Sequence, residues 1–162
     1  MPTYPVITIL GDNPATVERY STYTDAGVTV SPTEGTSLAT SNYVIPDTVG
    51  TYTVSYAAFL SSNDTPPEVT VSIAIRTVNV VDTISPIITV IGDNPVTIEK
   101  GSSYSDAWAT SDGGETVTVS TTLDTMTIGR YIINYSATDA GGNTGTARRL
   151  AIVVDTTEPV IT

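Results

Sequence analysis

Residues 5–26 read PVITILGDNPATVERYSTYTDA, and residues 86–107 read PIITVIGDNPVTIEKGSSYSDA. The two stretches lie 81 residues apart (86 − 5), and 13 of their 22 positions are identical. Eight of the other nine positions exchange residues of similar character, and only Tyr20 against Gly101 does not. A repeat this clear decides the architecture of a chain before any single residue does. The 162 residues are therefore predicted to form two tandem domains.

The junctions between repeats recur as well. The stretch VVDTISP at 80–86 matches VVDTTEP at 153–159, so we place the first domain at 1–81 and the second at 82–155. Residues 156–162 then begin a third copy, or form a terminal strand that pairs with a neighbouring molecule. Roughly four residues separate the strands across a junction, and so short a linker predicts touching domains in an elongated rod.

The apolar residues of both repeats recur with a period of two. Tyr52, Val54 and Tyr56 share one face of a predicted strand, and residues 131–135 repeat the pattern. Val, Ile, Thr and Tyr favour strands, whereas Gly, Pro, Asn and Asp fall between the runs as turn residues. No segment carries a helical apolar stripe. Each repeat is therefore predicted to be an antiparallel β-sandwich of about seven strands.

Two motifs predict local geometry in each repeat. The proline of GDNP, at 11–14 and 92–95, removes a ladder donor and favours extended backbone before it. This predicts that the first strand breaks in two and passes from one sheet to the other. Tyr52 and Tyr131 each follow a Gly at the start of an alternating strand. We expect each to place its ring in the core and its hydroxyl on nearby backbone, as a tyrosine corner.

The first repeat is the longer one, at 81 residues (86 − 5) against 73 (159 − 86). Most of the additional length falls near residues 59–67, a predicted loop before the last strand. Loops carry binding specificity more often than strands do. The 59–67 loop is either a neutral insertion or, like the 111–115 loop, a site for a glycan or a protein receptor.

Charge excludes several classes of partner. The chain carries 17 acidic and 6 basic residues, a net charge of −11. Binding to nucleic acid or to anionic lipid requires a basic surface. No apolar run approaches the roughly 18 residues of a membrane span. We therefore expect neither nucleic-acid binding nor membrane insertion.

Catalysis is not expected. The chain contains no His and no Cys, which excludes Ser-His-Asp and Cys-His arrangements. Lys100 is the only lysine and stands where the first repeat has Arg19, which indicates surface structure and not an activated amine. The aspartates that recur in both repeats are predicted to lie in turns. The chain is therefore predicted not to be an enzyme.

Calcium is the one cofactor that the sequence allows, because Ca²⁺ takes six to eight oxygen ligands from carboxylates, carbonyls and water. The candidate ligands lie at the junctions, in the GDNP turns and in a Gly-rich loop: Asp82, Asp155, Asp12, Asp93 and Asp139. The alternative is that these aspartates form turns by bonding to local backbone.

Trp108 is the only tryptophan and stands where the first repeat has Gly27. It is either an exposed platform on which a sugar stacks or a packing residue in the core or between domains. Packing is the commoner role of a lone tryptophan in a sandwich, and we expect it here.

The shared pattern PxITxxGDNPxTxExxSxYxDA, followed by GxYxxxY and VVDTxxP, resembles the bacterial Ig-like domains found in tandem in very large surface proteins, close to hyalin-repeat modules. Residues 135–144 are similar to the family's late loop, and the first repeat departs from it there. The resemblance implies an all-β fold of two tandem Ig-like antiparallel β-sandwiches.

The resemblance also implies a location and a role. It indicates an extracellular or cell-surface location, or a virion surface, and a spacer or adhesion module next to further repeats of the same protein. Two alternatives remain open. One is a module that binds a glycan or a protein receptor through variable loops, and the other is a filament or virion subunit that self-associates through its terminal strand.

Overall fold

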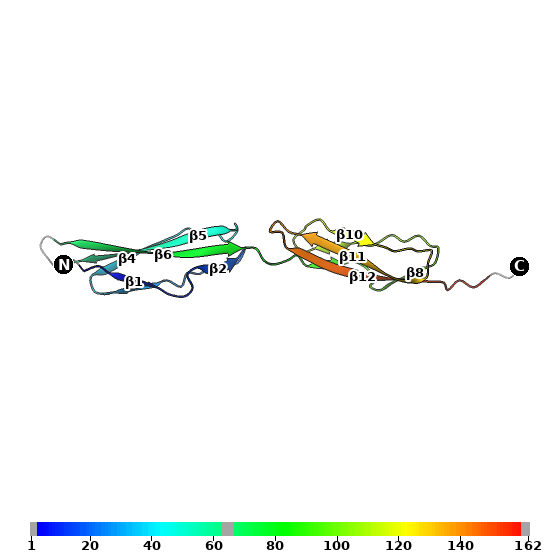
Figure 1. The fold of residues 1–162 in the computed structure, drawn as a ribbon, viewed down its shortest axis with the longest axis horizontal. Coiled ribbons are helices and arrows are strands. Elements are labelled where there is room, and N and C mark those ends of the chain that lie inside the picture. The colour runs from blue at the N-terminus through cyan, green and yellow to red at the C-terminus, as the bar shows by residue number, and fades with distance from the viewer. Residues whose placement is uncertain (1–2, 63–66, 160–162) are drawn as a thin grey trace. The chain divides into compact units, whose positions relative to one another are not determined.

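The computed structural model describes residues 3–62 and 67–159, whose strands are drawn in Figure 1. The chain divides into two compact units, Met1–Asp82 and Thr83–Thr162. All twelve elements of the described residues are β-strands, which confirms the predicted all-β class. None of the described residues belongs to a helix that could cross a membrane.

The first unit is a sandwich of a small and a large sheet. The small sheet has the order β1-β3, and the large sheet has the order β2-β6-β5-β4. The strands are β1 (Val6–Ile9), β2 (Ala15–Glu18), β3 (Val28–Ser31), β4 (Thr36–Asn42), β5 (Gly50–Ser61) and β6 (Val69–Val81).

The second unit repeats this topology. Its small sheet is β7-β9, and its large sheet has the order β10-β11-β12-β8. The strands are β7 (Ile88–Val90), β8 (Val96–Glu99), β9 (Ala109–Ser111), β10 (Thr118–Thr121), β11 (Gly129–Thr138) and β12 (Thr144–Val154). The repeat in sequence is therefore a repeat of strand order.

The described part of each unit has six strands, where the sequence predicted about seven. The reason lies between β4 and β5, where the backbone bonds locally and does not join a sheet. The N–H of Val44 donates to the side chain of Asn42, and the N–H of Thr48 donates to the carbonyl of Ile45. Such local bonds compete with ladder formation.

The first strand of each unit breaks at its GDNP motif, as predicted. β1 pairs antiparallel with β3, and β2 pairs in parallel with β6. β7 and β8 divide in the same way between β9 and β12. Gly11 and Gly92 make the turn with φ of 71° and 82°, and a Cβ there would lie 3.2 Å from the Cβ of Ala26 or Ala107. Glycine suits both the backbone angle and the close approach.

An asparagine side chain covers the strand edge beside each break. Asn13 donates through Nδ2 to the carbonyl of Ile75 at 3.2 Å and accepts the N–H of Thr77 at 2.9 Å. Asn94 makes the same two bonds to the main chain of β12, both at 2.9 Å. The side chain thus stands in for the strand pairing that is interrupted there.

Period-two alternation fills one core in each unit, as predicted. Val54, Tyr56 and Val78 are buried in the first unit, and Ile133 and Tyr135 belong to the matching cluster of the second. Burial of such side chains is the main favourable contribution to the folding free energy.

Both tyrosine corners are present. The hydroxyl of Tyr52 donates to the carbonyl of Thr48 at 2.8 Å, and that of Tyr131 donates to Thr127 at 2.9 Å. Each ring packs against the core of its own unit. The prediction from the GxY motif is confirmed in both repeats.

The extra length of the first repeat is mostly strand, so the predicted loop at 59–67 is wrong at its start. The ladder continues until Ser61 faces Val69, whereas the β11–β12 ladder ends where Thr138 faces Thr144. The alternating pattern of β5 simply runs further before the turn. Residues 63–66 of the predicted loop lie outside the described residues.

The first half of β6 carries its large apolar residues on the outside. Val78 and Val80 point inward, so a period of two places the odd-numbered positions outward. The exposed set is Val69, Val71, Ile73 and Ile75, at 41–70% exposure. The second repeat has Thr144, Thr146 and Arg148 at the positions of the last three.

Candidate functional site

A buried ion pair lies inside the first unit. Arg76 on β6 is 1% exposed, and its Nε lies 2.8 Å from Oδ1 of Asp25. The hydroxyl of Tyr23 donates to the same oxygen at 3.0 Å, and that of Tyr56 donates to Oδ2 at 2.5 Å. The carboxylate therefore has a cationic partner and two hydroxyl donors.

The second unit builds the same arrangement. Arg149 on β12 is 2% exposed, and its Nε lies 3.3 Å from Oδ1 of Asp106. The hydroxyls of Tyr104 and Tyr135 donate to this carboxylate at 2.7 and 2.6 Å. We call each set of one Arg, one Asp and two Tyr an arginine cluster.

Each guanidinium also fastens the GDNP turn. Arg76 donates to the carbonyls of Leu10 and Asp12, and to that of Gly27 at 3.1 Å. Arg149 makes matching bonds to the residues before the second GDNP turn and before β9. An arginine cluster thus joins the break in the first strand, the approach to the next strand and the last strand of its unit.

Hydrogen bonds and charge together keep the aspartates ionised. Burial raises the pKa of Asp25, but hydrogen bonds from Tyr56, Tyr23 and a backbone N–H and the charge of Arg76 hold that pKa below its ordinary value. The pKa of Asp106 is lowered by the same balance of causes. Each carboxylate therefore remains negative through the neutral range.

The tyrosines of the arginine clusters stay neutral. Burial, and next the hydrogen bond to Asp25, raise the pKa of Tyr23 to about 12. Burial and the bond to Asp106 do the same for Tyr135, again to about 12. With an arginine that is always protonated, neither cluster holds a group poised to exchange a proton near neutral pH. The clusters fit a structural role better than a catalytic one.

The arginine clusters are what the sequence reasoning missed. Arg76 and Arg149 entered it only as part of the positive charge, and the recurring aspartates were expected in turns. A signal was present, because the two arginines lie 73 residues apart, the same offset as Asp82 and Asp155. Each also stands in line with the inward-facing apolar residues of an alternating strand, where a charge needs a buried partner.

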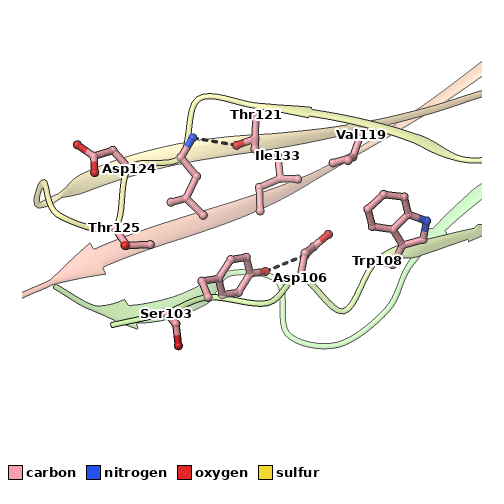
Figure 2. A pocket seen from close by; sticks show the side chains of 10 residues that line it. Ser103, Asp106, Trp108, Val119, Thr121, Asp124, Thr125 and Ile133 are labelled. Carbon is pink, nitrogen blue, oxygen red and sulfur yellow. Dashed lines mark hydrogen bonds between the residues drawn. The ribbon is translucent and has the colours of Figure 1, made fainter. Parts of the chain in front are cut away.

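A pocket of about 590 Å³ opens beside the second arginine cluster. Figure 2 shows Trp108 at one end, Asp124 and Thr125 at the other, and Asp106 and Ile133 between them. Trp108 also lines a second hollow of about 430 Å³ together with residues of the 111–115 loop. One indole ring therefore borders both hollows.

Trp108 is an exposed residue in an unfavourable backbone conformation. Its side chain is 43% exposed, so the expected core packing is wrong. Its φ is 73°, and Gly27 has 76° at the matching position. The left-handed conformation costs a residue with a Cβ about 1–2 kcal/mol. The second unit thus keeps a bulky residue where the first has the residue that the backbone prefers.

The structure does not bring the five predicted calcium ligands together. Asp82 pairs with Arg19 at 3.2 Å, and Asp155 pairs with Lys100 at 3.4 Å. Within residues 3–62 and 67–159, no group of three or more acidic, His or Cys side chains could hold a metal ion.

The other three aspartates lie in bends of the chain. Asp139 accepts the N–H of Asn143 at 2.8 Å and its Nδ2 at 3.0 Å, the turn-forming role given as the alternative. Asp12 and Asp93 lie in the GDNP motifs of different units. Calcium binding stays a prediction.

The start of the third copy is tied to the second unit. The carboxylate of Glu99 accepts the N–H and hydroxyl of Thr156 at 2.8 and 2.7 Å, and those of Thr157 at 3.2 and 3.0 Å. Residues 156–159 form no strand, and residues 160–162 of the predicted terminal strand lie outside the described residues.

Residues 88–153 match the family model described as "Bacterial surface protein, Ig-like domain", which confirms the expected resemblance over the second unit. No curated protein matches the chain in sequence.

Solved structures with a related arrangement are extracellular cadherin domains. The protocadherin GammaB4 extracellular domain is 12% identical with a TM-score of 0.38, covering 94% of this chain and 33% of its own. The protocadherin Gamma B7 extracellular cadherin domains 1–4 are 13% identical with a TM-score of 0.32, covering 93% and 51%. The chain thus spans between a third and about half of those two proteins.

Proposed function

We propose, from the match of its second unit to a bacterial surface Ig-like domain, that the chain is a non-catalytic extracellular spacer or adhesion module of a larger repetitive surface protein. In this role the two units hold another part of the protein away from a surface. Their task is to remain folded while the chain is under tension.

The observation that carries the proposal is the parallel pairing of the second strand with the last strand in each unit. β2 lies parallel to β6, and β8 lies parallel to β12, each over four registered pairs. A force on the two chain ends pulls β2 toward the N-terminus and β6 toward the C-terminus. The pairs are then sheared together, which requires several hydrogen bonds to break at once.

The arginine clusters support the same role. Arg76 connects the turn before β2 with β6, and Arg149 connects the turn before β8 with β12. Each cluster therefore joins the two segments that tension would separate.

Single-molecule pulling tests the proposal. Cysteines added at the two ends provide attachment points, because the native chain has none. We expect two unfolding events of similar high force, one for each unit.

A second attachment provides the control within one molecule. β5 and β6 are antiparallel, and Thr51 lies at the end of β5 that is nearest the end of β6. Pulling between Thr51→Cys and the C-terminus opens the first unit pair by pair while it still shears the second. One low-force and one high-force event are expected. Equal forces for the first unit in both geometries would overturn the proposal.

A further inference from the structure

Trp108 is kept in the second unit without serving its fold. The matching Gly27 has the same positive φ, and its carbonyl accepts Arg76 just as the carbonyl of Trp108 accepts Arg149. The backbone role at this position therefore needs no side chain. Bulky residues in strained backbone are a reason to look for function, and this one presents a ring that is 43% exposed to the pocket.

The pocket differs from the same region of the first unit mainly at its two ends. Its floor is shared, because Tyr104 and Asp106 correspond to Tyr23 and Asp25. At the ends, Trp108 replaces Gly27, while Asp124 and Thr125 stand where the first repeat has Ile45 and Pro46. The second unit therefore combines an aromatic face at one end with hydrogen-bonding side chains at the other (Figure 2).

The electrostatics of the pocket favour an uncharged ligand. The charge of Asp106 is matched by Arg149, and its oxygens accept two tyrosine hydroxyls. Asp124 accepts the N–H of Met126 at 2.9 Å and the hydroxyl of Thr127 at 2.7 Å, so part of its capacity is already used. Apolar side chains of Val119, Leu123 and Ile133 also line the pocket.

We propose that this pocket binds a neutral saccharide, with one sugar ring stacked on Trp108 and its hydroxyls bonded to Asp124 and Thr125. A pyranose ring has an apolar C–H face and polar edges, and an exposed indole suits such a face. Sites of this kind combine apolar walls with a few polar groups that fix the ligand's orientation. The saccharide site goes beyond the spacer role, because pulling and sugar binding can succeed or fail independently.

The test is a titration of the full chain with methyl glycosides and short neutral oligosaccharides of glucose, galactose, mannose and N-acetylglucosamine. Trp108 is the only tryptophan, so its fluorescence reports on this pocket directly. We expect a saturable spectral change with at least one of these sugars, unaffected by added salt.

The matched variant is Trp108→Gly, which restores the residue of the first repeat. Calorimetric titration should show binding weakened at least about tenfold, since tenfold is the smallest change that clearly separates two affinities. Its melting temperature should stay within about 5 °C of the parent, because the expected stability change is small. Trp108→Phe should recover part of the binding.

Asp124 provides the second arm of the test. Asp124→Ile, again the residue of the first repeat, should weaken binding, whereas Asp124→Asn should retain much of it, because an amide still bonds to hydroxyls. Three results would overturn the proposal: no saturable response to any of the sugars, unchanged affinity in Trp108→Gly, or salt-sensitive binding of a lysine-rich peptide in place of the sugars.

Discussion

Arg149 lies in line with apolar side chains of β12, and the negative charge of Asp106 compensates its own. Removing one partner of a buried ion pair leaves the other charge uncompensated, at a typical cost of 3–5 kcal/mol. We therefore expect Arg149→Met to lower the free energy of unfolding of the second unit by about 3–5 kcal/mol. Urea unfolding followed by Trp108 fluorescence measures this unit alone, since Trp108 is the only tryptophan.

The control for this prediction is Lys100→Met. Lys100 and Asp155 also form an ion pair, but both side chains are 43% exposed. Exposed pairs contribute about 0–1 kcal/mol. Losses of equal size in the two variants would contradict a special role for the buried arginine.

The pH dependence of stability follows from the same residues. The pKa of folded Asp106 is lowered, so its contribution is present above the ordinary value of about 3.9 and is lost as pH falls through the folded value. The pKa of Tyr135 is raised from 10.0 to about 12, so its contribution is complete below pH 10 and is lost between pH 10 and 12.

Urea unfolding of the second unit across this pH range should therefore show a plateau that declines at both extremes. In Asp106→Asn the acid decline should be smaller, because this carboxyl no longer titrates. An acid limb of unchanged size in that variant would assign the effect to other groups.

Single residues show where sequence reasoning succeeds and where it does not. The tyrosine corner is predictable because its partner carbonyl lies only four positions upstream. The arginine cluster is not, because Arg76 meets carbonyls more than sixty positions away. For Trp108, the sequence showed only that a glycine had been replaced, and exposure depended on the folded surroundings.

At the scale of elements, the GDNP break depends on one asparagine. Asn94 bonds twice to the main chain of β12, and its removal leaves those two backbone groups without this partner. Each lost bond of this kind costs about 1 kcal/mol or more. We expect Asn94→Ala to destabilise the second unit by about 1–3 kcal/mol in urea unfolding. Asn134→Ala, at an exposed position on β11, should change stability by less than about 0.5 kcal/mol.

The outward face of β6 provides a second prediction at this scale. Val71→Thr, Ile73→Thr and Ile75→Arg introduce the residues of the second unit at exposed positions. Thermal unfolding of the combined variant should lie within a few degrees of the parent, because little buried apolar area is lost. Val78→Thr, at a fully buried position, should by contrast be clearly destabilising.

Strand breaks and pairing partners were predictable because proline and glycine act locally. The orientation of β6 was not, since alternation gives a period without saying which face is inside. Val78, Val80 and Arg76 determine the inward face, and the valines and isoleucines of the first half follow outward. The predicted seventh strand failed because local bonds held the segment between β4 and β5.

At the scale of the whole molecule, the sequence repeat predicted the duplicated topology, while calcium binding remains to be measured. Asp82 and Asp155 already have cationic partners. We therefore expect the melting temperature to be the same in millimolar Ca²⁺ and in EGTA. A rise in Ca²⁺ that EGTA reverses would instead support a metal site at the predicted aspartates.

The arginine cluster also has a consequence for timing. In the first unit Asp25 and Tyr56 come early and midway, whereas Arg76 lies only six residues before the unit ends at Asp82. A chain is synthesised from its N-terminus, and contacts between distant residues form only when both are available. The cluster therefore closes only after almost the entire unit has emerged. A partly delivered repeat stays open and pliable, which suits a protein that must be threaded outward before it becomes rigid.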